Sequence, residues 1–166
     1  MLVAKEDVVK ISADIIHDLK KMARNNGLNK SRLLLHKNRE EMIHEMLIVY
    51  ISSPPKKFKY NIPHSNTNTS KSYQVIEGEV ILVIFDNKGG IYDYYLLSAN
   101  SVEKYFMVRL NASAYHMMIP ISNELVYIET LLGTSTGKVD APWAPDEDDS
   151  LAAQKYIENL CSLMNI

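Results

Sequence analysis

The segment that decides the fold class is Tyr73-Gln74-Val75-Ile76-Glu77-Gly78-Glu79-Val80-Ile81-Leu82-Val83-Ile84-Phe85. It is rich in β-branched and aromatic residues, which favour strands over helices. The pair Glu77-Gly78 interrupts the segment with a signal typical of turns and kinks. Short apolar runs bounded by such residues predict extended structure, so we expect strand conformation that is divided or bent at Gly78.

The same pattern recurs on both sides of this segment. Further expected strands are 46–52, 58–62, 91–99, 105–110, 115–119 and 125–132. Turn signals such as Pro54-Pro55 and Asn87-Lys88-Gly89-Gly90 separate them, and no helical period lies between them. Many short strands without intervening helices predict an antiparallel sandwich or barrel. The polar segment 64–70 has no apolar periodicity, and we expect it to be a loop.

Helices are expected on both sides of the strands. Ser12 is a plausible N-cap for a helix that ends at Asn25-Asn26-Gly27. The apolar stripe of this helix recurs at helical spacing: Ile15, Ile16, Leu19, Met22 and Ala23. Two prolines should keep 141–145 irregular, with Trp143 anchored against the strands, and Ser150 should cap a C-terminal helix. We therefore expect one domain over 1–166: a helical region 1–45, a barrel of about 46–132, and a C-terminal extension with its helix over 133–166.

Composition argues against several classes of partner. The 166 residues carry a net charge of -2, which gives no reason to expect a nucleic-acid partner. No apolar run reaches the roughly eighteen residues of a membrane span. Cys161 is the single cysteine, and acids at Glu6 and Asp7 stand where a signal peptide would be apolar. A cytoplasmic protein is the expectation.

Two histidines carry the strongest hint of chemistry. His64 and Asn66 are two residues apart and would point to one side of extended backbone, while His116 lies near the start of a later strand. Histidines with a carboxylate suit zinc, iron or manganese, but Lys71 would oppose such an ion. Two histidines far apart in the chain are weak evidence for a metal site, and from the residues alone ordinary hydrogen-bonded or exposed histidines are the favoured explanation. Glu129, an acid in an apolar strand, must be exposed, paired or functional, and pairing is the default.

A family resemblance joins these features. The spacing from Pro63-His64 through Asn66, Lys71 and Gly78 to His116 is that of a cupin barrel. Further matching segments are Leu35-His36 after Arg32, Met46-Leu47-Ile48, Tyr60, Leu82-Val83-Ile84-Phe85-Asp86, Glu129 and Ala141-Pro142-Trp143-Ala144-Pro145. Most of the chain thus resembles the WbuC family of cupin-fold metalloproteins, which occurs in bacterial gene clusters for O-antigen and related surface polysaccharides.

The resemblance implies a mainly β, cupin-type antiparallel jelly-roll barrel with flanking N- and C-terminal α-helices. It also implies a metal held by a His-x-His pair, a glutamate and a later histidine. Only His64 and His116 carry over as ligands, because Asn66 and Lys71 replace the second histidine and the glutamate. Ile62, Ser113 and Asn111 also replace residues of the family pattern. We therefore expect a degenerate metal site, with either no cofactor or a weakly bound zinc, iron or manganese to which Asn66 could contribute.

The expected function is a role in surface-polysaccharide (O-antigen) biosynthesis, by binding or acting on a sugar nucleotide. The expected ligand pocket comprises His64, Asn66, Lys71, His116 and Glu129. An alternative is a non-catalytic cupin that has lost its metal and binds a small molecule or anion near Lys71. A third is a partner-binding protein that uses its strands to form a homodimer. Whether the chain is an enzyme stays open at this point.

Overall fold

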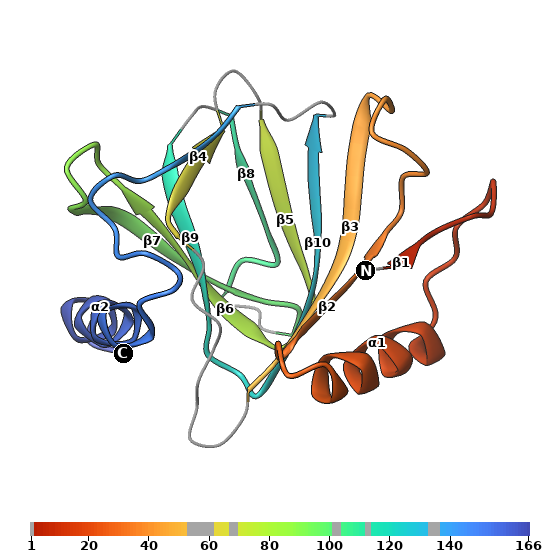
Figure 1. Cartoon of the computed structure of the whole chain (residues 1–166), viewed down its shortest axis with the longest axis horizontal. Helices are drawn as coiled ribbons and strands as arrows, with labels where there is room; N and C mark the ends of the chain where they lie inside the picture. Colours follow the sequence, from red (N-terminus) through yellow and green to blue (C-terminus); the bar gives the residue numbers. More distant parts are fainter. Residues whose placement is uncertain (1, 53–61, 67–69, 101–103, 112–113, 133–136) are drawn as a thin grey trace.

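The computed structural model describes residues 2–52, 62–66, 70–100, 104–111, 114–132 and 137–166. Within this part of the chain the strands form two sheets that face each other, and a helix covers the outer side of each (Figure 1). The expected strand 58–62 lies outside the described residues except for Ile62. The mainly β architecture with flanking helices is confirmed.

The first sheet has six described strands. In spatial order they are β1 (Leu2–Val3), β2 (Lys30–Leu34), β3 (Ile43–Ile51), β10 (Glu124–Leu132), β5 (Lys71–Glu77) and β8 (Met107–Leu110). The second sheet has five: β11 (Lys138–Asp140), β4 (His64–Asn66), β9 (Tyr115–Pro120), β6 (Glu79–Phe85) and β7 (Ile91–Ser98). Neighbouring strands pair antiparallel, except that β1 pairs with β2 in parallel.

Alternation along the strands sorts their side chains into an inner and an outer set. On β3, Ile48 and Tyr50 face the space between the sheets, whereas Leu47 and Val49 pack on the first helix. On β6, Leu82 belongs to the inner core and its neighbours belong to the cluster under the second helix. Because both faces of β6 are covered, it reads as a continuous apolar run instead of an alternating one.

The turn signal at Gly78 marks the passage of the chain from one sheet to the other. β5 ends at Glu77 in the first sheet, and β6 begins at Glu79 in the second. Gly78 has φ +83°, and a Cβ added to it would lie 2.1 Å from the carbonyl oxygen of Glu124. A side chain at this position would therefore be strained both by backbone conformation and by contact.

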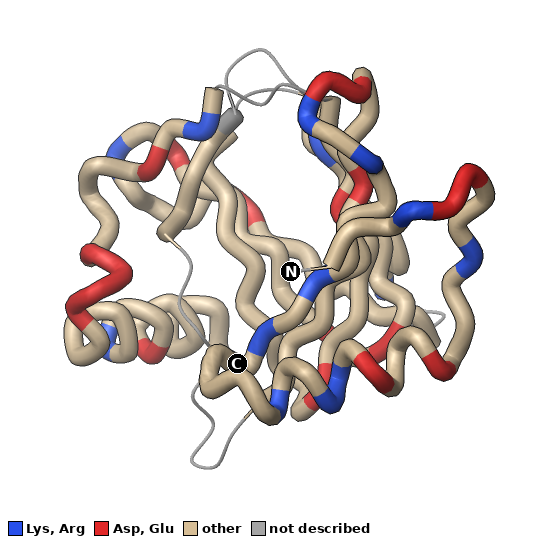
Figure 2. The backbone as a smooth tube through the Cα atoms, turned by 45° about the vertical axis from the view of Figure 1, so that its right-hand side comes forward, with Lys and Arg blue, Asp and Glu red and all other residues tan. Residues whose placement is uncertain are grey.

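The helices lie close to their expected positions. α1 spans Ala13–Asn25 and is capped by Ser12, whose Oγ accepts from the backbone N–H of Ile15. α2 spans Ser150–Leu163, and Asp149, one residue before the expected cap, accepts from the N–H of Ala152. Neither helix of the described chain is long and apolar enough to cross a bilayer. Charged positions of both signs are interspersed along the backbone (Figure 2).

Ion pairs hold α1 on the first sheet in addition to its apolar stripe. Lys20 bonds to Glu77 and lies 2.7 Å from Glu124, which also pairs with Arg24. The two lysine contacts raise the pKa of Lys20 against the opposing effect of burial, and they hold the pKa of Glu124 below its usual range. Glu77 and Glu124 sit at the end of β5 and the start of β10, so these pairs fix the helix at the bottom of the barrel in Figure 1.

The structure corrects three boundaries. The expected loop 64–70 contains strand β4, and the region 1–45 contains β1, β2 and the start of β3 besides its helix. The sheets therefore extend beyond 46–132 on both sides, since β11 follows at 138–140. β2 and β4 were missed because they place Lys30, Arg32 and His64 towards a pocket, which removes the apolar alternation that marks a strand.

Candidate ligand-binding site

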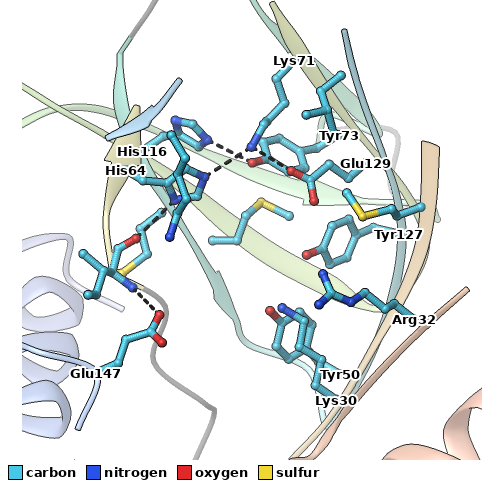
Figure 3. Close-up of a pocket in the computed structure, with 16 residues that line it drawn as sticks. Lys30, Arg32, Tyr50, His64, Lys71, Tyr73, His116, Tyr127, Glu129 and Glu147 are labelled. Carbon is cyan, nitrogen blue, oxygen red and sulfur yellow. Dashed lines mark hydrogen bonds and ion pairs between the residues drawn. The ribbon is translucent and has the colours of Figure 1, made fainter. Parts of the chain in front are cut away.

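A pocket of about 350 Å³ opens between the two sheets (Figure 3). Its innermost polar groups come from four strands and form what we call the floor cluster: His64, Lys71, Tyr73, His116 and Glu129. Its outer edge, the rim, carries Lys30, Arg32, Lys138 and Glu147. Tyr50 and Tyr127 line the wall between them and stack with ring centroids 6.1 Å apart.

Strand pairing brings the two histidines together. His64 on β4 is the direct cross-strand partner of His116 on β9, and their ring centroids are 4.6 Å apart. The Nδ1 of His64 lies 3.2 Å from the carbonyl oxygen of Ile62, and that of His116 lies 2.9 Å from the carbonyl oxygen of Ala114. A carbonyl can only accept, so Nδ1 carries the proton in both rings and each Nε2 presents a lone pair.

Both histidines are neutral at pH 7. Burial, followed by the nearby charge of Lys71, lowers the pKa of His64 to about 4. Burial, followed by His64 and then Lys71, lowers the pKa of His116 to about 3. Only 2% of His116 is exposed, so water cannot replace the hydrogen bonds of its ring. The pair thus offers acceptor nitrogens and no charge.

Lys71 fills the space between the histidines and Glu129. Its Nζ lies 3.2 Å from Nε2 of His64 and 2.8 Å from Oε1 of Glu129. The side chains of Lys71 and Glu129 are only 6% and 14% exposed. The lysine therefore donates to one histidine and forms a buried ion pair with the glutamate of the neighbouring strand, where the attraction is screened less than at a surface.

Tyr73 holds the second histidine. Its hydroxyl lies 2.9 Å from Nε2 of His116 and also within hydrogen-bonding reach of Glu129. Burial and the charge of Glu129 raise the pKa of Tyr73 well above its usual range, so the hydroxyl keeps its proton. That single proton faces two acceptors. One of them can therefore accept a further hydrogen bond from a donor that enters the pocket.

The predicted site residues are placed as follows. One pocket is lined by His64, Lys71, His116 and Glu129. Glu129 forms an ion pair with Lys71, which agrees with the expectation that an acid in an apolar strand is paired. Asn66 pairs through its backbone with Lys138 on β11, and its side chain is outside the described part of the structure. The role of these residues in binding a ligand stays a prediction.

The floor cluster does not fit the divalent metal that the family resemblance implies. The Nε2 atoms of His64 and His116 are engaged by Lys71 and Tyr73. Among the described residues, no three His, Cys, Asp or Glu side chains are arranged to hold an ion. An ammonium group 3.2 Å from a ligand nitrogen would also repel a dication strongly in this buried position.

Sequence reasoning missed the tyrosines and the cationic side of the rim. Tyr73 lies two residues after Lys71 and Tyr50 two residues after Ile48, so strand alternation could have placed them on inward faces. Arg32 is exposed, and it lines the pocket beside Lys30. The alternation of Lys30 and Arg32 with Ser31 and Leu33 was the available signal, because Ser31 and Leu33 face α1.

No protein-family model matches the sequence, and no curated protein matches it either. Similar solved structures include the capsular polysaccharide assembling protein CapF from Staphylococcus aureus (12% identity, TM-score 0.52, covering 68% of this chain and 32% of that one). CapF in complex with the inhibitor 3-isopropenyl-tropolone is another (13% identity, TM-score 0.50, 64% and 29%). An oxalate oxidase matches with 11% identity and TM-score 0.50, over 78% of this chain and 73% of that one.

The chain thus spans about a third of the length of CapF. Identities this low carry no information about substrate or reaction, but the likeness covers 68% and 78% of this chain for CapF and the oxalate oxidase, respectively. The antiparallel jelly-roll barrel is the fold that this chain shares with these cupins. The chain is therefore a cupin-fold protein.

Proposed function

We propose that this chain is a ligand-binding cupin that works without a resident metal and takes a sugar nucleotide in surface-polysaccharide assembly. The observation that carries the proposal is the buried ion pair between Lys71 and Glu129 in the floor cluster. It supplies a fixed donor and a fixed acceptor at the inner end of a pocket, beside the histidine that Lys71 engages. Paired polar groups of this kind orient a small molecule without needing an ion.

The character of the pocket favours a sugar over an apolar ligand. Tyr50 and Tyr127 present aromatic faces, and Tyr73 presents a hydroxyl, so the walls combine apolar area with hydrogen-bonding groups. The volume of about 350 Å³ lies at the lower end of the range for small-molecule sites, about 300–1,000 Å³. A monosaccharide unit with its hydroxyls suits both the size and the polarity.

The link to polysaccharides rests on two likenesses. CapF, which shares the fold, is a capsular polysaccharide assembling protein, and the sequence pattern resembles the WbuC family of surface-polysaccharide clusters. Both are arguments by analogy, because a fold hosts many functions. These likenesses select the class of ligand to test first, and the structural support for the proposal comes from the geometry of the pocket.

A second candidate is a cupin that binds a small anion alone and catalyses nothing. Within the floor cluster each functional group already has a protein partner, which favours binding over catalysis. The cations at the rim would attract an anion without any sugar. Binding of free phosphate or carboxylates with no gain from an attached sugar would support this candidate over the first.

Thermal unfolding with a ligand panel tests the proposal. The panel holds UDP-, GDP- and dTDP-sugars at millimolar concentration, beside the free nucleotides, free sugars and sodium phosphate. A ligand at a hundredfold excess over Kd stabilises the native state by about 2.7 kcal/mol, which raises the midpoint of a domain this size by roughly 5–10 °C. A rise with one sugar nucleotide that exceeds the rise with its free nucleotide is the expected result. No rise with any sugar nucleotide would overturn the proposal.

A further inference from the structure

We propose that the ligand of this pocket is a phosphorylated sugar bound in one orientation, with its hydroxyls on the floor cluster and its phosphate at the rim beside Lys30 and Arg32. This inference rests on the proposed function and adds the position of the ligand's charge. It also assigns two residues of β2 as an anion subsite, which is separate from Lys71.

The floor cluster is a poor place for an anion because its charges already cancel. The ammonium of Lys71 is neutralised by Glu129 at 2.8 Å, and both histidines are neutral. A phosphate entering there would face the carboxylate of Glu129, which is only 14% exposed and therefore weakly screened. Hydroxyl groups meet no such repulsion, and they can bond to the acceptor that the Tyr73 proton leaves unsatisfied.

The cations of the rim are unevenly distributed around the opening. Lys30 and Arg32 lie two residues apart on β2 and both line the pocket. Within the described residues, neither forms an ion pair with a carboxylate. Lys138, on β11 of the other sheet, is paired with Asp140 at 2.7 Å. Glu147 lies across the pocket from Arg32 (Figure 3), so among the described lining residues of the rim the unpaired positive charges lie on the β2 side.

The local geometry of β2 suits a phosphate. The ammonium of Lys30 lies over the ring of Tyr50, 4.7 Å from its centroid, which holds the charge at the pocket wall. Arg32 is exposed, and its guanidinium points into the opening in Figure 3. A guanidinium fork matches two phosphate oxygens, and a nearby ammonium adds a point charge. With a pocket of about 350 Å³, the sugar fills the interior and a nucleoside on the phosphate projects past the rim.

The test uses inorganic diphosphate, because this probe reports the anion subsite whatever the sugar is. Amide NMR spectra are recorded while diphosphate is titrated into the whole chain. We expect shifts at Lys30, Ser31 and Arg32, and none at His64 or His116. The double variant Lys30→Gln/Arg32→Gln should weaken binding at least tenfold, while the control Lys138→Gln, which removes a cation already paired, should change it less than twofold.

Four results bear on the inference separately from the proposed function. Diphosphate shifts centred on His64 and Lys71, or no diphosphate binding at all, would overturn the rim subsite even if sugar nucleotides raise the unfolding midpoint. Equal weakening by Lys138→Gln would overturn it too, because general surface charge would then explain binding. Rim binding of diphosphate without any stabilisation by sugar nucleotides would sink the proposed function and leave the anion subsite standing.

Discussion

The buried ion pair makes a sharp prediction about stability. Lys71→Met keeps the length and apolar stem of the side chain but leaves the carboxylate of Glu129 buried without its cation. It also removes the donor to Nε2 of His64. Breaking one partner of a buried pair costs about 3–5 kcal/mol, so the unfolding midpoint should fall by roughly 6–20 °C. The double variant Lys71→Met/Glu129→Gln removes both charges and should recover most of this loss, to within about 2 kcal/mol of the original chain.

Urea unfolding at pH 7 measures the free-energy differences, and thermal unfolding measures the midpoints, both followed by circular dichroism. The matched control is Lys104→Met, which breaks the ion pair with Glu79, where the side chains are 28% and 37% exposed. Pairs exposed to this degree contribute about 0–1 kcal/mol, so the control should be nearly silent. If Lys71→Met is as mild as the control, or if the double variant is no more stable than Lys71→Met, the ion pair does not organise the floor cluster.

Three further outcomes are expected. Elemental analysis after purification without chelator should find little tightly bound zinc, iron or manganese, and the double variant Asn66→His/Lys71→Glu should bind more of these metals. Near-stoichiometric metal that is lost on mutating His64 or His116 would refute the proposal of a metal-free site. The free energy of unfolding should fall as pH drops from about 6.5 towards about 4. His64 and His116 have pKa values of about 4 and about 3 in the folded chain but near 6.5 when unfolded, so the unfolded chain binds more protons in this range. Urea unfolding at pH 5 and pH 7 should show the loss, and the difference should be smaller in His64→Gln. Gly78→Ala should destabilise the protein far more than Gly27→Ala. Both glycines have positive φ (+83° and +67°), but of the two only Gly78 has backbone atoms within contact distance of an added Cβ. Similar unfolding midpoints of the two variants would contradict this expectation.

Local patterns in the sequence were sufficient for most of the fold. The apolar runs of β3 and β6 are continuous because both faces of these strands are covered, and the stripe of α1 recurs at helical spacing because one face of that helix is covered. Gly78 indicated that the strand is divided there, and the structure shows that the division is the passage from one sheet to the other. β2 and β4 escaped detection because the side chains that they point into the pocket are polar, and a strand without apolar alternation resembles a loop.

What the sequence by itself determined was the class of fold and the candidate residues His64, Lys71, His116 and Glu129, since strand periodicity and motif spacing are properties of neighbouring positions. What only the tertiary structure decided was how these residues pair. Register between strands distant in the chain places Glu129 across from Tyr73, and side-chain reach then joins Lys71 to both Glu129 and His64. Register depends on the packing of whole sheets, so no local pattern could say that Lys71 is already neutralised while Lys30 and Arg32 form no ion pair within the described part of the pocket.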